Sequence, residues 1–194
     1  MSLILASTSI YKRKLMEQLQ LPFLPVSPPY REEHELDLMP QEKCLYLAEQ
    51  KARSLMDEYG DRVIISSDQI LISGERQFGK PLRADTALEQ LRWMQSHRNV
   101  FHTGLAVYDP GKKQFHLRME PCEIRLRPWS VEQLKHYIER DNPLHCAGAF
   151  KAESLGIILL ETIETRDYSS LIGLPLIQLV GVLNEIGYPI LSSP

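Results

Sequence analysis

The sequence predicts an α/β protein in which a mixed β-sheet is flanked by helices. Strand-like and helix-like segments alternate through the first part of the chain. In the middle, two long strand-like segments at residues 99–108 and 114–126 are joined through the turn sequence of residues 109–112, which predicts an antiparallel hairpin. Residues 176–186 form an apolar closing helix that ends at Gly187. Alternation favours parallel strands and the hairpin adds antiparallel ones, so a mixed sheet accounts for both.

The first elements are a strand, a helix and a second strand. Residues 3–6 form a short apolar run that predicts a buried strand. The hydroxyl-rich turn after it ends at Ser9, a residue type that favours a helix N-cap. Apolar residues then recur at every fourth position from 11 to 19, which predicts a helix with one buried face. A second strand is expected at residues 23–26, followed by an acidic loop at residues 31–35.

A long helix and a buried strand come next. Pro40 stands where the first helical turn tolerates proline, and an apolar stripe continues from there to Tyr59. Residues 63–65 are β-branched without interruption, which suits a strand covered on both faces. This strand leads into residues 66–69, and residues 70–72 continue it.

The second half adds two helices, a loop and a strand. Asp85 is expected to cap one helix, and residues 130–133 have the form of a capping box that begins another. Residues 148–153 are interpreted as a loop and residues 157–160 as a strand. Since no internal repeat, low-complexity tract or linker interrupts the pattern, we expect a single domain over residues 1–194.

Composition excludes several classes of protein. The 22 basic and 25 acidic residues leave a net charge of -3, so a broad surface for a nucleic-acid polymer is not expected. The start carries no basic leader, and no apolar run is long enough to span a bilayer. We therefore expect a cytoplasmic protein that does not bind a membrane. The three cysteines form no CxxC pair, which argues against a disulfide framework. His145 and Cys146 are adjacent in the sequence, and adjacent residues seldom bind the same zinc ion.

The first turn of the first helix carries an unusual run of cations. Lys12, Arg13 and Lys14 lie where the positive end of the helix dipole disfavours them. A bound phosphate would offset this, because the free N–H groups of the helix start and the hydroxyls of Ser7 and Ser9 would complete an anion pocket. A solvated basic face is the alternative interpretation, and the segment alone leaves both open.

Asp68 directly follows an apolar strand, at the place where open α/β sheets bind their ligands. A turn or a helix cap is the alternative interpretation. Glu32 and Glu33 lie in a loop that also follows a strand, so their carboxylates could meet Asp68. Two carboxylates together with phosphate oxygens are the hard ligands that Mg²⁺ prefers.

Two lysines add candidate cations. Lys51 falls on the apolar stripe of the long helix, where an unpaired ammonium would be costly to bury. It therefore either extends to water or reaches a carboxylate or a phosphate. Lys80 lies between Gly79 and Pro81 in a rigid loop, and it is either a surface turn residue or a cation held toward a triphosphate.

These residues, in this order, resemble the Maf family of nucleotide pyrophosphatases across essentially the whole chain. One matching motif would be weak evidence, whereas the ordered set is strong. The matching motifs are residues 5–13, the pattern around Lys51 from Ala48 to Ala52, Ser67-Asp68-Gln69, Gly79-Lys80-Pro81, Thr103-Gly104, residues 147–150 and residues 172–176.

Within that family, the Asp68-Gln69 pair, the aromatic Tyr11 and the run of residues 143–148 resemble the branch that acts on 7-methyl-GTP. The resemblance implies that Asp68 is the catalytic acid/base residue, and that Tyr11, Gln69 and Glu153 govern the choice of base. An aromatic ring can stack on a methylated, cationic purine, and amide and carboxylate groups can bond its edge.

The chain departs from the family pattern at four places, one of which is the acidic loop around Arg31, Glu32 and Glu33 that carries the second carboxylate. Ile10 stands where the family often has proline, and Tyr11 replaces the usual tryptophan of the branch. Lys12 stands where the family often has arginine, so that bidentate gripping of phosphate rests on Arg13.

The resemblance also implies a fold of two lobes around a central cleft, similar to Maf and ITPase proteins, and a homodimer. The implied reaction is that of a hydrolase acting on acid anhydrides, which converts 7-methyl-GTP to the nucleoside monophosphate and pyrophosphate and so clears modified nucleotides. A divalent cation, Mg²⁺ or Mn²⁺, would be held by Glu32 and Asp68. The implied phosphate-binding residues are Ser7, Ser9, Lys12, Arg13, Lys51 and Lys80.

Two alternatives stay open at this point. The substrate of the same enzyme could be dTTP or UTP. In the other alternative, the protein is a non-catalytic nucleotide-binding regulator of cell division.

Overall fold

The computed structural model describes residues 3–31 and 37–191 of the 194-residue chain. The chain divides into two compact units. The first unit comprises the described residues of Met1–Gln69, Thr103–Glu120 and Asp167–Pro194, and the second comprises Ile70–His102 and Pro121–Arg166. The single domain over residues 1–194 and the cleft between two lobes stay predictions.

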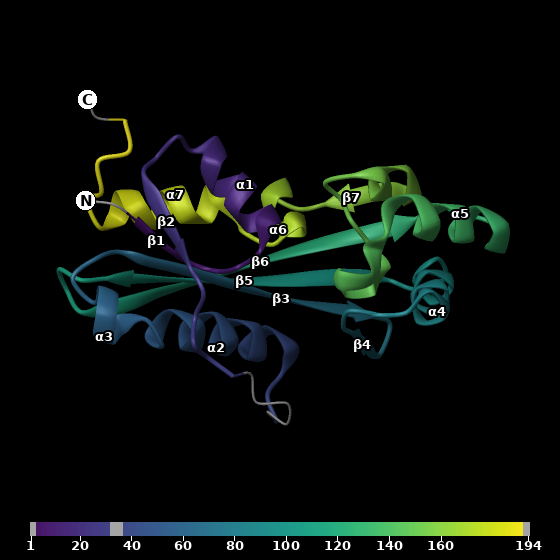
Figure 1. The fold of residues 1–194 in the computed structure, drawn as a ribbon. Coiled ribbons are helices and arrows are strands. Elements are labelled where there is room, and N and C mark those ends of the chain that lie inside the picture. Colours follow the sequence, from purple (N-terminus) through teal and green to yellow (C-terminus); the bar gives the residue numbers. More distant parts are fainter. Residues whose placement is uncertain (1–2, 32–36, 192–194) are drawn as a thin grey trace. The chain divides into compact units, whose positions relative to one another are not determined.

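Within the described residues the strands form one seven-stranded sheet in the order β2-β1-β3-β5-β6-β7, with β4 pairing with β3 (Figure 1). β1 pairs in parallel with β2 and with β3, whereas β3 with β4 and β6 with β7 are antiparallel. The mixed sheet flanked by helices that the sequence predicts is therefore confirmed. The strands are β1 (Leu3–Ala6), β2 (Phe23–Val26), β3 (Ile64–Ser73), β4 (Arg76–Phe78), β5 (Asn99–Asp109), β6 (Gln114–Leu126) and β7 (Leu160–Glu164).

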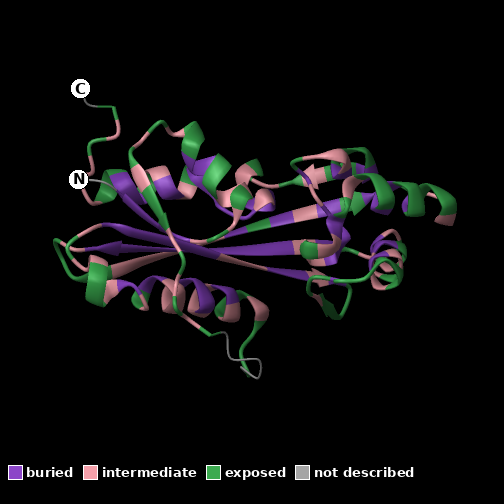
Figure 2. Cartoon of the chain, in the orientation of Figure 1, coloured by how far each residue is buried: buried purple, intermediate pink, exposed green. Residues whose placement is uncertain are grey.

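In the first unit, helices cover both faces of the strands (Figure 1). On one face lie α1 (Ile10–Gln18), α6 (Tyr168–Ile172) and α7 (Leu176–Glu185), and on the other lie α2 (Pro40–Arg53) and α3 (Met56–Tyr59). Successive strand residues point to opposite faces. Leu5 accordingly packs in the core beneath α1 and α7, whereas Ile4 packs in the core beneath α2. Every residue of β1 is buried, as the central strands in Figure 2 show.

Gly104 on β5 allows α2 to approach the sheet closely. A Cβ atom added there would lie 2.8 Å from the carbonyl carbon and oxygen of Cys44 on α2. Glycine has no Cβ, so the helix backbone packs directly on the strand at this point.

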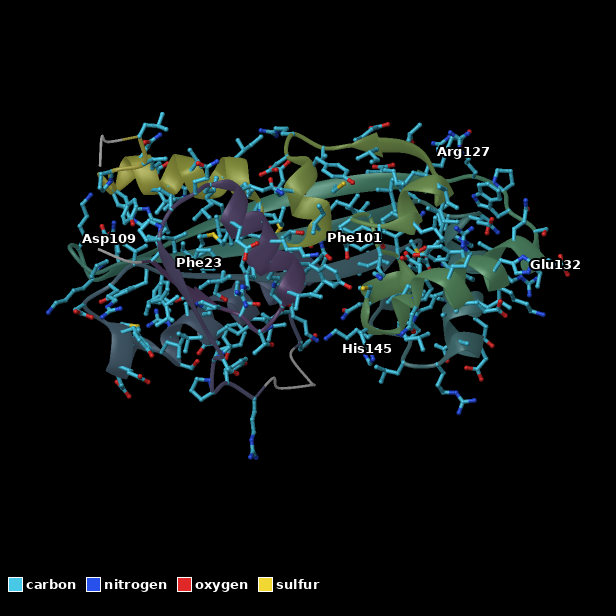
Figure 3. The ribbon with its side chains drawn as sticks, turned by 45° about the horizontal axis from the view of Figure 1, so that its top comes forward. Phe23, Phe101, Asp109, Arg127, Glu132 and His145 are labelled. Atoms are coloured by element: carbon cyan, nitrogen blue, oxygen red, sulfur yellow. The ribbon has the colours of Figure 1, made fainter. Side chains whose placement is uncertain are left out.

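In the second unit, α4 (Ala84–Met94) packs against α5 (Val131–Asp141) and against the short 3₁₀ turns η1 (Pro143–His145) and η2 (Ala147–Ala149). Figure 3 labels Glu132 on α5 and His145 on η1. The capping box predicted before α5 is present. The Ser130 hydroxyl accepts from the Gln133 N–H at 3.3 Å, and the Gln133 side chain accepts from the Ser130 N–H at 2.9 Å.

Three predicted boundaries are wrong. Asp85 is not the cap of α4, because the cap is Arg83 and Asp85 lies in the first turn, where its carboxylate accepts from the Thr86 N–H. The apolar run at residues 157–160 is mostly a 3₁₀ helix, η3 (Leu155–Leu159), since a short apolar run does not separate helix from strand. The long helix ends at Arg53, where the Ser54 hydroxyl bonds to the Lys51 carbonyl oxygen at 2.8 Å and competes with helical hydrogen bonding.

We expect Gly104→Ala to lower the free energy of unfolding by about 1–3 kcal/mol, because the added methyl group overlaps the backbone of α2. Urea denaturation measures this. Gly181→Ala in α7 is the matched control, because a Cβ there meets nothing within 4 Å. The control should gain about 0.5–1 kcal/mol from helix propensity. Equal effects of the two substitutions would show that Gly104 does not set the approach of α2.

Candidate functional site

Asp68 lies in the middle of β3. The sequence pattern had placed it at the end of a strand, and that prediction is wrong. β3 pairs with β1 at Ile64 and Ile65 and with β4 from Leu71 onward. Asp68 lies between these two paired stretches. β3 also pairs with β5, so the strand continues through its polar residues. Their side chains find hydrogen-bond partners on both faces, the Lys51 ammonium on one and backbone carbonyl oxygens on the other.

A partly buried ion pair joins Asp68 to α2. The Lys51 Nζ donates to Asp68 Oδ1 at 2.5 Å, and the two side chains are only 17% and 15% exposed. Asp68 shares a face of β3 with Ile64, which packs against α2. The lysine on the apolar stripe therefore has a carboxylate partner, as a buried ammonium requires. Charge-assisted hydrogen bonds of this kind are strong and fix both groups.

The start of α1 places hydroxyl groups and a cation beside the same strand. Ser9 is the N-cap, as predicted, and its Oγ accepts from the Lys12 N–H at 3.5 Å. Ser7 Oγ accepts from the Ser9 N–H at 3.1 Å. Each hydroxyl still has a proton to donate to an anion. The Lys12 Nζ donates to the Ser67 carbonyl oxygen at 2.5 Å, next to Asp68 in the chain.

The other predicted residues of α1 lie closer to solvent. Arg13 pairs with Glu17 at 3.3 Å, with side chains that are 60% and 52% exposed. Exposed pairs one helical turn apart are weak, so this pair does not prevent Arg13 from meeting an anion. Tyr11 is partly buried.

Gln69 faces the opposite side of β3 from Asp68. Its Nε2 donates to the carbonyl oxygens of Ser170 at 2.8 Å and Leu171 at 3.2 Å, and to the Thr103 hydroxyl at 3.0 Å. Carbonyl oxygens only accept, so the amide nitrogen must point toward α6. The amide oxygen is then the part of the side chain that remains for another donor.

Lys80 and Glu153 belong to the second unit, and both are exposed. Residues on either side of Glu153 are attached to the end of α5. Asp141 Oδ1 accepts from the Ser154 hydroxyl at 2.7 Å, and the Lys151 Nζ donates to the Asp141 carbonyl oxygen at 2.7 Å. These bonds define the local conformation of the segment that carries Glu153.

Two cysteines, Cys44 and Cys146, have raised pKa values. Burial raises the pKa of the Cys146 thiol to about 11, and the negative charge of Glu153 adds to this, while Lys151 and Lys80 oppose it. Burial, followed by the charge of Asp68, raises the pKa of Cys44 to about 12. A thiol that stays protonated at neutral pH is a poor nucleophile, so neither is a candidate for covalent catalysis.

Among the predicted residues, the first unit brings Lys51 to Asp68 and brings Lys12 to the adjacent Ser67 carbonyl. Glu32 lies outside the described residues. Sequence reasoning did not single out Thr103, or the hydroxyl of Ser67, as a partner within this network. The alternation of β3 was the available signal, because Ser67 and Gln69 must share the face opposite Asp68.

The described residues contain no group of three or more His, Cys, Asp or Glu side chains that could hold a metal ion. Asp68 supplies one carboxylate, with one oxygen bound to Lys51. Mg²⁺ commonly binds through one or two carboxylates together with substrate phosphates and water, so Asp68 fits as one ligand. No described helix has both the length and the apolar character to span a bilayer.

Comparisons of the sequence with known proteins show the family of the chain. The family model described as Maf-like protein matches residues 2–186. The 7-methyl-GTP pyrophosphatase of Syntrophotalea carbinolica is 40% identical over 192 residues, covering 98% of each chain. The protein of the same name from Colwellia psychrerythraea is 38% identical over 192 residues, covering 99% of this chain and 96% of the relative.

Among solved structures, the Ham1 protein of Staphylococcus aureus matches with a TM-score of 0.47 and 15% identity. The match covers 66% of this chain and 72% of that one. The family assignment rests on the matches along the sequence. Since the family model spans nearly the whole chain and two relatives exceed 30% identity over almost their full length, the chain belongs to the Maf family.

Proposed function

We propose that this protein hydrolyses a nucleoside triphosphate, with 7-methyl-GTP as its substrate, to the monophosphate and pyrophosphate, and so clears modified nucleotides. The observation that carries the proposal is the Asp68 carboxylate on β3, which is held by the partly buried ammonium of Lys51 on α2. The relatives named 7-methyl-GTP pyrophosphatase support the choice of substrate.

The triphosphate binds at the start of α1. Backbone N–H groups and the dipole of a helix N-terminus attract phosphate. The hydroxyls of Ser7 and Ser9 donate to its oxygens, and Lys12 and Arg13 neutralise its charge. The family resemblance supports Lys51 and Lys80 as further phosphate-binding cations.

Asp68 orients the attacking water and accepts its proton. Its Oδ1 is held by Lys51, which leaves Oδ2 for the water or for a cation. Asp68 and Glu32 would hold Mg²⁺ or Mn²⁺, which supplies charge neutralisation at the phosphate oxygens. Lys51 keeps the carboxylate in one orientation, because a charged hydrogen bond in a partly buried setting resists rotation.

The base is read by Tyr11, Gln69 and Glu153. Tyr11 stacks on the methylated, positively charged purine. Gln69 offers its amide oxygen to an N–H of the base edge, because its amide nitrogen bonds to the carbonyl oxygens of α6. Glu153 contributes a negative charge that favours the cationic base. The protein acts in the cytoplasm as a homodimer, without nucleic-acid or membrane partners.

We expect the wild-type protein, assayed with a divalent cation, to release pyrophosphate and 7-methyl-GMP from 7-methyl-GTP, and Asp68→Asn to lose at least about a hundredfold in kcat. Asparagine keeps the volume but removes the charge that accepts the proton. Products are separated chromatographically over a panel of triphosphates that includes dTTP and UTP.

Asp85→Asn is a control for removing a carboxylate, because Asp85 pairs with Arg83 on the exposed first turn of α4. It should leave kcat unchanged. Initial release of orthophosphate, or an Asp68→Asn variant as active as the wild type, would refute the proposed reaction. Binding without hydrolysis of any triphosphate would favour a regulator.

We expect Glu153→Ala to lower kcat/KM for 7-methyl-GTP about tenfold more than for GTP, because an interaction with the methylated cation is worth roughly 1–2 kcal/mol when desolvated. Steady-state kinetics on the two substrates measure the ratio. Glu161→Ala, at an exposed position of β7, is the control and should leave the ratio unchanged. Equal losses on both substrates would remove Glu153 from base recognition.

A further inference from the structure

The residues on both sides of Asp68 are attached to one segment, residues 170–173. Ser67 is buried, with 1% of its surface exposed. Its hydroxyl donates to the Gly173 carbonyl oxygen at 2.7 Å. The Gln69 amide nitrogen donates to the carbonyl oxygens of Ser170 and Leu171. β3 is thus held on one face immediately before and immediately after Asp68, while Asp68 itself faces Lys51 on the other.

Segment 170–173 is itself held in place. The Asp167 carboxylate accepts from the Ser169 N–H at 3.0 Å through Oδ1 and from the Ile177 N–H at 2.7 Å through Oδ2. It therefore joins the beginnings of α6 and α7. Gly173 ends α6 with φ of 118°, a conformation that side-chain-bearing residues rarely adopt. The direction of the Gly173 carbonyl is fixed by these constraints.

Ser67 also meets α1 through its backbone. Its carbonyl oxygen accepts from the Lys12 Nζ at 2.5 Å. A Cβ atom added to Gly173 would lie 3.4 Å from Lys12 Cε, so the lysine stem runs beside Gly173. Ser67 is therefore the residue at which the cation of α1, the strand and segment 170–173 are joined.

We propose that Ser67 is a positioning residue: its hydroxyl fixes β3 on Gly173, and this bond sets the orientation of Asp68 and the place of the Lys12 ammonium. The proposal rests on the proposed function, because it assigns Asp68 to the chemistry. Adjacent strand residues share a backbone, so a rotation at Ser67 turns the Asp68 side chain relative to Lys51. A misplacement of about 1 Å can cost a hundredfold in rate.

Three serines of β3 provide a matched set of variants. Ser73 is as buried as Ser67 and donates to Asn99 Oδ1 at the same distance of 2.7 Å. Ser66 is buried too, and its hydroxyl has no partner among the described residues. Ser67→Ala and Ser73→Ala each remove one buried hydrogen bond and should lower the urea midpoint to a similar extent. Ser66→Ala removes none.

The test is steady-state hydrolysis of 7-methyl-GTP together with urea denaturation of each variant. Ser67→Ala should lower kcat about tenfold, whereas Ser73→Ala and Ser66→Ala should keep wild-type kcat. Ser67→Thr, which keeps the hydroxyl, should restore most of the rate. If the alanine variant proves too unstable to assay, Ser67→Cys keeps the volume with a weak donor and should show the same fall in kcat.

The outcomes separate the two proposals. A wild-type protein that hydrolyses no triphosphate refutes the proposed function. An active wild type whose Ser67→Ala or Ser67→Cys variant turns over within about twofold of it refutes the positioning role alone. If Ser73→Ala loses as much stability as Ser67→Ala and its kcat falls by the same factor, the effect is a general one on the strand. That result also refutes the positioning role.

Discussion

The interaction on which the first unit depends is the ion pair of Lys51 and Asp68. A lysine on the apolar face of a helix and an aspartate inside a buried strand are each unfavourable alone, because either charge would lose its water without a partner. Together they require α2 and β3 to meet in one register. Gly104 permits that contact, because it has no side chain and the backbone of α2 packs directly on β5 at this residue. Ala52 of α2 and Ile64 of β3 belong to one apolar core cluster, so the helix and strand that carry the pair also pack on each other.

The two faces of β3 carry side chains of different kinds. Toward α2 the strand presents a charge, and toward α6 it presents neutral groups that bond to backbone carbonyl oxygens. Neutral hydrogen bonds to backbone suit an anchoring task, because they need no counter-charge and are not weakened by ions in the solvent. In the proposed function Asp68 acts on the water from the charged face, while on the other face the Gln69 amide nitrogen holds the strand and its amide oxygen remains for the base.

Much of the architecture could be predicted because local patterns determine it. The cap at Ser9, the capping box at Ser130 and the alternation of strands and helices were confirmed. Asp68 was wrongly predicted to end a strand, because the polar run of residues 66–69 has the same pattern whether it leaves the sheet or finds partners from distant residues. Those partners, such as Ser170 and Gly173, lie about a hundred positions away in the sequence. The approach of Lys51 to Asp68 was one of several open alternatives, since periodicity shows that a buried lysine needs a partner but not which one.

The raised pKa values of Cys44 and Cys146 bear on how the protein withstands oxidants. Peroxides and disulfides react with the thiolate, and the sulfenic acid that starts oxidative damage forms from that species. With a pKa of about 11, Cys146 is a thiolate in about one molecule in ten thousand at pH 7, and Cys44 in fewer. Burial of both sulfurs therefore keeps the reactive thiolate scarce, so oxidation at Cys44 and Cys146 should be slow at neutral pH.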